Sequence, residues 1–100
     1  MALFGRATEI QSSPQQIEEG LRHLRDETMP ALREFEGAKG FIAFGNRETG
    51  KLIGISLWES QDAMVKARDR ASQLRSAGAQ AAGGQITDVT EYEVMLDERF

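Results

Sequence analysis

The sequence predicts an α+β fold of the ferredoxin-like type, in which a four-stranded antiparallel sheet carries two helices on one face. Two observations predict it. Strand-like and helical segments alternate in the order β-α-β-β-α-β, and the strand-like segments are short and rich in β-branched and aromatic residues. A chain of 100 residues has room for one hydrophobic core, so residues 1–100 are expected to form a single domain.

The first strand and the first helix are predicted over the first third of the chain. Residues 1–10 are lightly charged and indicate a strand, and Ser13 is expected to cap a helix that begins near Pro14. Pro30 has no backbone donor, so a kink or break is expected near Met29. One face of this helix should point to the core, because apolar residues and one threonine recur there at steps of four and three: Ile17, Leu21, Leu24, Thr28, Leu32 and Phe35.

A hairpin is predicted in the middle of the chain. Residues 41–45 and 52–58 are apolar, β-branched and aromatic, which is typical of strands. The polar link between them, residues 46–51, contains Gly50 and suits a tight connection. The two strands are therefore expected to pair antiparallel.

A second helix and a last strand complete the pattern. Ser60 and Asp62 stand where a helix N-terminus prefers a capping hydroxyl and an acidic group. The predicted buried stripe of this helix is made mostly of small residues: Met64, Ala67, Ala71 and Leu74. Residues 76–84 hold four alanines and three glycines and predict a frayed helix end passing into a mobile loop. Residues 85–95 predict the last strand, with Leu96 continuing it.

Both faces of the predicted sheet are apolar. In residues 52–58 the period of two places Ile53, Ile55 and Leu57 on one face and Leu52 and Trp58 on the other. Two helices can cover one face only. The other is expected to be covered by a second copy of the chain, which gives a homodimer through the sheet face.

Composition excludes several classes of function. The chain has no cysteine and a single histidine, His23, so it offers no disulfide, no thiolate nucleophile and no multi-histidine metal site. A net charge of −4 argues against binding of nucleic acid or an anionic membrane surface. No apolar run approaches the roughly 20 residues of a membrane span, and a cytoplasmic location is expected.

Two segments carry a resemblance to a known family. Gly40-Phe41 opens the second predicted strand, and Trp58-Glu59-Ser60 joins the third strand to the second helix. With residues 32–41 and 57–64 around them, they resemble the antibiotic biosynthesis monooxygenase-like domains of the dimeric α/β-barrel superfamily. This resemblance implies a dimeric α/β barrel and, for some members, oxygenation of anthrone-like or quinol substrates without a cofactor.

The sequence does not match the residue pattern of the haem-degrading branch of that family. Its members use an asparagine in the first strand and a tryptophan and a histidine on the second helical segment. Here Arg6, Ala7 and Thr8 lie in the first strand, and His23 lies on the first helix. Haem degradation is therefore not expected, and no cofactor or metal is expected either.

The candidate ligand-binding residues are aromatic. Trp58, Phe44 and Phe4 would wall a cavity between sheet and helices that takes a small hydrophobic ligand; the other interpretation of Trp58, which this one does not exclude, is an anchor at the strand end that packs under the second helix. His23 and Tyr92 are the candidate catalytic groups. The alternatives are a surface histidine and a tyrosine at a strand pair or a dimer interface.

Arg6 and the overall function each leave two interpretations open. Arg6 either ends at the sheet edge or points into a pocket and pairs with Glu91 or Glu93. The first functional hypothesis is a cofactor-independent monooxygenase that acts on a small aromatic substrate of the quinol or polyketide type. The alternative is a non-catalytic dimeric barrel that binds a small hydrophobic ligand or serves a structural or stress-related role.

Overall fold

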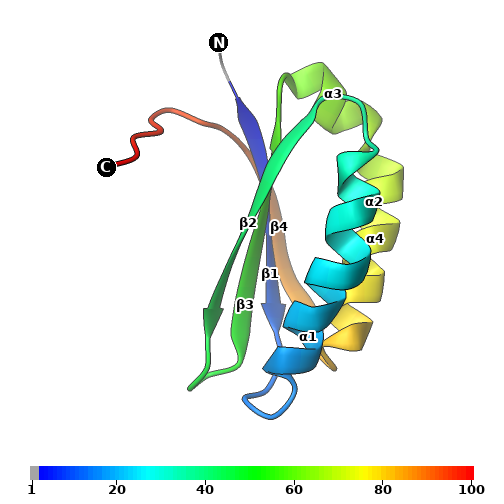
Figure 1. Ribbon diagram of the computed structural model, residues 1–100, viewed down its shortest axis with the longest axis vertical. Helices are drawn as coiled ribbons and strands as arrows, with labels where there is room; N and C mark the ends of the chain where they lie inside the picture. The colour runs from blue at the N-terminus through cyan, green and yellow to red at the C-terminus, as the bar shows by residue number, and fades with distance from the viewer. Residues whose placement is uncertain (1–2) are drawn as a thin grey trace.

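The computed structural model describes residues 3–100 and shows a four-stranded antiparallel sheet with the helices packed on one face (Figure 1). The strands are β1 (Phe4–Gln11), β2 (Ala38–Asn46), β3 (Lys51–Trp58) and β4 (Gln85–Glu93), and they lie in the order β2-β3-β1-β4. The helical segments are α1 (Ile17–His23), the π-helix η1 (Leu24–Thr28), α2 (Met29–Arg33), α3 (Gln61–Lys66) and α4 (Arg68–Ala81). The predicted ferredoxin-like α+β fold is confirmed.

The strand ends differ from the predicted ones by a few residues. β1 begins at Phe4 and runs to Gln11, and the first two residues of its predicted range lie outside the described part of the chain. β2 begins at Ala38, three residues early, because Gly37 turns the chain with φ 84° and its carbonyl accepts a hydrogen bond from the Glu59 N–H at 2.8 Å. β4 ends at Glu93, before the predicted end.

The first helix begins later than predicted. Ser13 is not its cap, because α1 begins at Ile17 after Gln16, which makes no side-chain capping bond. The carbonyl of Ser13 instead accepts the N–H groups of Gln16 and Ile17 at 3.0 and 3.1 Å, so a turn precedes the helix.

The predicted interruption at Pro30 is present and takes the form of a π-helix. Pro30 occupies the first turn of α2, where a missing N–H costs little. Just before it, the Met29 N–H donates to the carbonyl of Leu24, five residues back, which is the π-helical pattern. The wide turn accommodates the proline ring while the helical path continues (Figure 1). Thr28 and Leu32 thereby remain on the buried side.

The second helical region is more ordered than its composition suggests. Ser60 caps α3 as predicted, and its Oγ accepts the Ala63 N–H at 3.1 Å. The prediction of a frayed end and a mobile loop over residues 76–84 is wrong, since α4 continues to Ala81 and Ala82 is fully buried. Ala82 must be small because α1 lies very close to it. A Cβ added to Gly20 of α1 would stand 2.8 Å from the Cβ of Ala82.

Two apolar clusters join the helices to the sheet. Leu32, Phe35, Trp58 and Met64 form one, and Ile17, Leu52 and Ala82 form the other. The Trp58 ring is fully buried and lies 5.9 Å from the Phe35 ring, centroid to centroid. Its Nε1–H donates to the Ser56 Oγ at 2.9 Å, so the polar end of the ring is satisfied inside the core.

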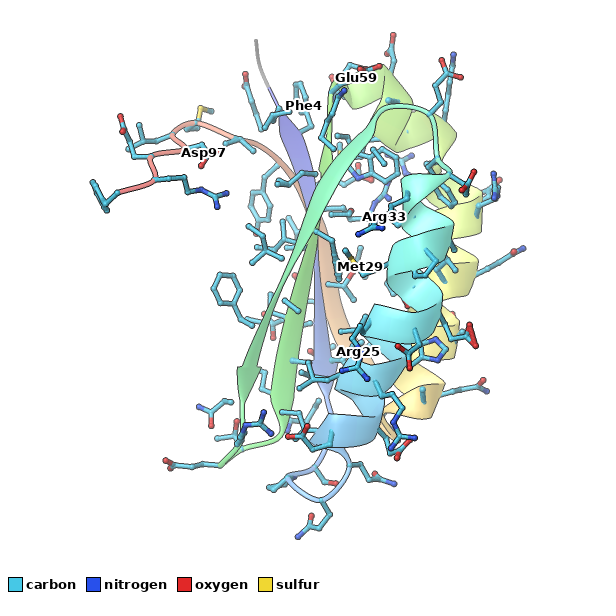
Figure 2. The ribbon with its side chains drawn as sticks, viewed as in Figure 1. Phe4, Arg25, Met29, Arg33, Glu59 and Asp97 are labelled. Carbon is cyan, nitrogen blue, oxygen red and sulfur yellow. The ribbon has the colours of Figure 1, made fainter. Side chains whose placement is uncertain are left out.

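The opposite face of the sheet has no layer over it among residues 3–100. Ile55 stands opposite Ala7 and Ile42, and Phe44 stands opposite Ile53, so apolar side chains lie side by side across the strands. Phe44 keeps 56% of its surface exposed. Figure 2 shows side chains that project from the sheet on the side away from the helices. Residues 94–100 leave the end of β4 on this same side (Figure 1).

No helix within residues 3–100 has the length and apolar character that crossing a bilayer requires.

Candidate functional site

A small cavity lies between the sheet and the helices. Phe41 and Leu52 line it from the sheet, and Leu24, Leu32 and Leu74 line it from the helices. Its volume is about 80 Å³. An apolar cavity of about 150 Å³ is known to hold a benzene molecule, so this one has room for part of a single ring.

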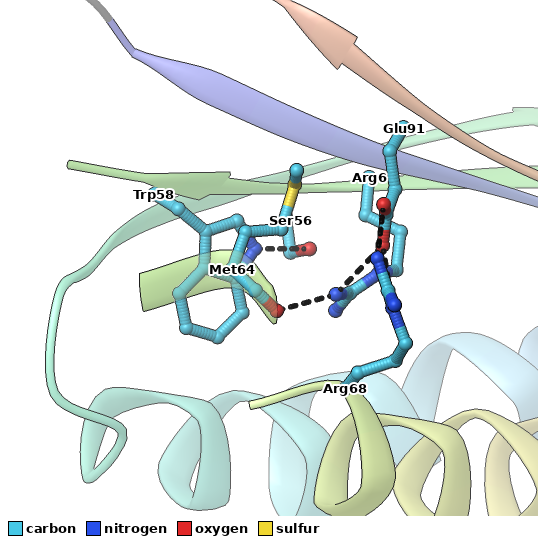
Figure 3. Close-up of polar contacts among 6 residues, drawn as sticks. All are labelled: Arg6, Ser56, Trp58, Met64, Arg68 and Glu91. Atoms are coloured by element: carbon cyan, nitrogen blue, oxygen red, sulfur yellow. Dashed lines mark hydrogen bonds and ion pairs between the residues drawn. The ribbon is translucent and has the colours of Figure 1, made fainter. Parts of the chain in front are cut away.

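Arg6 brings a positive charge to the wall of this cavity. Its side chain extends from β1 toward the helices and is only 3% exposed (Figure 3). Nη2 donates to the carbonyl oxygen of Met64 at 2.6 Å. Met64 lies in the last turn of α3, where carbonyls lack partners within their own helix, and a guanidinium is a favourable partner for them. The break between α3 and α4 thus helps to hold Arg6 in place.

Glu91 neutralises Arg6 from the neighbouring strand. Nε and Nη2 of Arg6 lie 3.1 and 3.0 Å from Oε2 of Glu91, and Nη2 of Arg68 lies 2.8 Å from its Oε1 (Figure 3). The hydrogen bond from Arg68, followed by the bond and the charge of Arg6, holds the pKa of Glu91 below its usual value. Glu91 therefore stays ionised and is a poor candidate for a general base.

Two buried polar atoms at the cavity have no partner among the described residues. They are Nη1 of Arg6 and Oγ1 of Thr28, and both residues line the cavity, one from β1 and the other from η1. Buried polar groups in folded proteins nearly always have a hydrogen-bond partner. The cavity therefore offers an occupant one cationic donor and one hydroxyl group on otherwise apolar walls.

An open groove lies outside the cavity, between α4 and β4. We call it the outer groove; it is lined by Arg68, Ser72 and Arg75 of α4 and by Val89 and Glu91 of β4, together with Arg6. Arg6 and Arg75 line the outer groove and the cavity alike. Burial, and then the positive charge of Arg6, lowers the pKa of Arg75.

The aromatic residues singled out from the sequence lie elsewhere. Trp58 and Phe4 belong to the buried cluster beside Met64, and neither lines the cavity. Phe44 lies on the uncovered face of the sheet. A role of these three residues in substrate binding stays a prediction.

The two candidate catalytic residues also lie outside the cavity. Tyr92 pairs with Gly5 and is 57% exposed. His23 is half-buried on α1 and does not line the cavity. Their catalytic roles stay predictions. Of the alternatives for Arg6, the structure shows the inward orientation and the pairing with Glu91.

Thr28 and Arg75 are site residues that sequence reasoning missed. Thr28 counted only as one member of the helical stripe, although a hydroxyl among apolar residues was a usable signal. Arg75 carried no signal, because one arginine in a charged helix is ordinary. Within residues 3–100 there is no cluster of three His, Asp or Glu side chains that could hold a metal ion.

Comparison with solved structures defines the class of fold. The monooxygenase ActVA-Orf6 of Streptomyces coelicolor, solved with the ligand nanaomycin D, superimposes with a TM-score of 0.69 at 15% identity, over 99% of this chain and 90% of that one. SnoaB, a cofactor-independent oxygenase of Streptomyces nogalater, gives a TM-score of 0.63 at 12% identity, over 99% and 97%. The chain has the fold of the antibiotic biosynthesis monooxygenase-like proteins, as its resemblance predicts.

Sequence comparison identifies particular relatives. The chain is 34% identical over 97 residues to Rv2557 and 32% identical over 97 residues to Rv2558, two uncharacterized proteins of Mycobacterium tuberculosis. The matches cover 97% of this chain but 43% and 41% of those proteins, so the chain spans less than half of their length. No protein-family model matches the sequence.

Proposed function

We propose that the protein is a cofactor-independent monooxygenase that oxidises a small hydroxylated aromatic molecule, of the quinol or polyketide type, at the cavity. One observation carries the proposal: the unpartnered Nη1 of Arg6 and Oγ1 of Thr28 belong to opposite walls of an apolar cavity. A hydroxylated ring presents oxygens to both groups and an apolar body to the rest of the wall.

The chemistry would rest on the charge of Arg6. A buried guanidinium beside a phenolic or enolic oxygen of the substrate favours the deprotonated, anionic form of the substrate, because the positive charge of the guanidinium acts in a poorly screened environment. The proton leaves to water through the outer groove. The electron-rich anion then reduces dioxygen without help from a metal or flavin.

The overall reaction balances with dioxygen as the sole oxidant. In an anthrone, a ring CH₂ beside the activated system becomes a carbonyl; in a hydroquinone, one ring CH becomes C–OH while the ring is oxidised to the quinone. In both cases one oxygen atom enters the product and the other leaves as water with two hydrogens. Four electrons pass from the substrate to dioxygen, so no external reductant is required. The cavity of about 80 Å³ would hold the reacting part of the ring while the remainder extends into the outer groove.

A homodimer through the uncovered face of the sheet belongs to the same proposal. It is supported by the neighbouring apolar side chains of Ile42, Phe44, Ile53 and Ile55, which no other part of residues 3–100 covers. The cytoplasmic location and the absence of a cofactor expected from the sequence stay predictions.

A second function, ligand binding without catalysis, is favoured by one specific observation. No histidine or carboxylate from residues 3–100 lines the cavity, and the nearby Glu91 is held by two arginines. A binding protein needs no proton acceptor, whereas an oxygenase here must lower the substrate pKa through the positive charge of arginine side chains.

Oxygen uptake separates the two functions. Anthrone and 1,4-naphthohydroquinone would be incubated with the protein after treatment with a chelator, with the buffer alone as the control. The oxygenase predicts uptake above the spontaneous rate and one ¹⁸O atom from ¹⁸O₂ in the product. Saturable binding of the same compounds without extra uptake would support the binding function and overturn the oxygenase.

A further inference from the structure

Arg75 stands at the junction between the cavity and the outer groove. It belongs to α4, it is half-buried, and it lines both spaces together with Arg6. Its guanidinium makes no hydrogen bond or ion pair with any residue in the range 3–100. By contrast, Arg6 and Arg68 each bind a carboxylate oxygen of Glu91.

The charges at this junction do not cancel. Arg6, Arg68 and Arg75 line the outer groove against two carboxylates, those of Asp69 and Glu91. Both oxygens of Glu91 are already engaged by Arg6 and Arg68. A surplus of positive charge therefore remains beside Arg75, although the whole chain carries a net charge of −4.

A second observation points to the same place. Nη1 of Arg6 is buried and has no partner among the described residues, while the other two nitrogens of this guanidinium are fully used. The junction thus combines the unpartnered Nη1 of a buried arginine, which carries two N–H donors, with an arginine that makes no ion pair among the described residues. Burial and then the charge of Arg6 also lower the pKa of Arg75, and the charge of Glu91 offsets only part of this effect.

We infer that this junction binds a carboxylate, and that the substrate class is therefore small aromatic acids. The carboxylate lies between Arg75 and Nη1 of Arg6, and part of the ring enters the apolar cavity. Arginine suits this role because its planar fork of donors matches the two oxygens of a carboxylate. The identity of the substrate class rests on the proposed function, but the binding step can be measured without turnover.

Benzoate is a suitable probe because it cannot undergo the proposed oxidation. Its binding would be measured by calorimetry beside benzamide, which has the same shape and no charge. We expect benzoate to bind about tenfold tighter than benzamide, as a charge-assisted pair requires, and 1 M salt to reduce this preference. Equal affinities for the two compounds would overturn the inference.

Three variants test whether Arg75 is responsible for the preference for benzoate over benzamide. Arg75→Gln should abolish the preference for benzoate, and Arg75→Lys should keep part of it. Arg70→Gln is the matched control, since Arg70 lies on the same helix, stacks on the Phe35 ring at 4.4 Å and lines neither space. It should keep the preference within about twofold. Equal losses in the Arg75→Gln and Arg70→Gln variants would contradict the assignment.

The remaining outcomes are also decisive. Thermal unfolding shows whether Arg75→Gln folds. If it does not, the inference is tested by the affinities of the wild type and of Arg75→Lys for benzoate and benzamide: a preference for benzoate that is weaker in Arg75→Lys supports it, and the absence of a preference overturns it. Binding of inorganic phosphate but not of benzoate would overturn the aromatic class. Benzoate binding without oxygen uptake in the presence of any hydroquinone would support the carboxylate site and contradict the proposed oxygenase activity. Oxygen uptake without benzoate binding would support the oxygenase activity and contradict the carboxylate site.

Discussion

Arg6 and Glu91 face each other on adjacent strands, and two nitrogens of Arg6 contact the same oxygen, Oε2, of Glu91 at 3.1 and 3.0 Å. Arg6 is almost completely buried, whereas the Glu91 side chain keeps 28% of its surface exposed. The pair therefore supplies a buried cation with its counter-charge while leaving Nη1 available at the cavity.

Replacing Glu91→Gln should destabilise the protein by about 2–3 kcal/mol, because it leaves the buried charge of Arg6 without its counter-ion. Urea unfolding followed by circular dichroism measures the loss. Glu93→Gln is the matched control, since Glu93 is exposed two residues further along β4 and forms no ion pair within the described chain. An equal effect of the two substitutions would show that the pair does not stabilise the fold.

The contribution of Glu91 should depend on pH. Its folded-state pKa lies below the ordinary value of 4.5, so the folded state binds fewer protons than the unfolded state. The stabilisation is complete above that ordinary value and is lost as the pH falls through the lower folded-state pKa. The stability difference between wild type and Glu91→Gln should thus be constant from pH 6 to 8 and shrink below about pH 4. A difference that stays constant down to pH 2 would contradict this.

Gly20→Ala should destabilise the protein although alanine favours helices. The new Cβ would stand 2.8 Å from the Cβ of Ala82 and 3.1 Å from Leu52 Cδ1, and such overpacking typically costs about 1–3 kcal/mol. Gly78→Ala in α4 is the control, because its Cβ would meet only His23, at 4.0 Å. It should gain up to about 1 kcal/mol from helix propensity. In thermal unfolding, the midpoint temperature should be lower than that of the wild type for Gly20→Ala and higher for Gly78→Ala.

Thr28→Val should raise stability while it lowers function. The hydroxyl is buried without a partner, so its replacement by a methyl group should stabilise the fold by roughly 1 kcal/mol. The same change removes a polar contact for the substrate and should reduce oxygen uptake with hydroquinones by about tenfold. A variant of unchanged stability and unchanged uptake would show that Thr28 has no part in the site.

Charge on the uncovered face should disrupt the proposed homodimer. Ile55→Lys places an ammonium group in the middle of the apolar face, where burial would cost several kcal/mol, roughly a hundredfold or more in the dissociation constant. Sedimentation equilibrium measures the change. Val65→Lys is the control, because Val65 is an exposed apolar residue on α3. A wild type that remains monomeric at tens of micromolar would overturn the dimer itself.

The element order and most of the core could be predicted from the sequence because periodicity reports which side of an element is buried. Ile17, Leu32 and Phe35 are buried as their spacing predicts. Residues 76–84 were misinterpreted because small side chains look like a flexible linker when the opposing helix is unknown. The small size of Ala82 is instead set by its contact with Gly20.

The site was harder to predict than the fold. The partner of Arg6 depends on the register between β1 and β4, and that register shifts between Glu9 and Ile10. A one-residue shift moves a side chain to the other face, so the pairing of Arg6 with Glu91 stayed open at the level of sequence. Arg75 and Thr28 stand out because their side chains have no hydrogen-bond or ion-pair partner among the described residues. Only the three-dimensional arrangement shows this.

The position of residues 94–100 has a practical consequence for experiments on assembly. Residues 94–100 leave the sheet on its uncovered side and carry Met95, Leu96 and Phe100 exposed to solvent (Figure 1). Donor and acceptor fluorophores attached to separate samples of a Phe100→Cys variant would thus sit on the side where a second copy is proposed to bind and would report association by energy transfer.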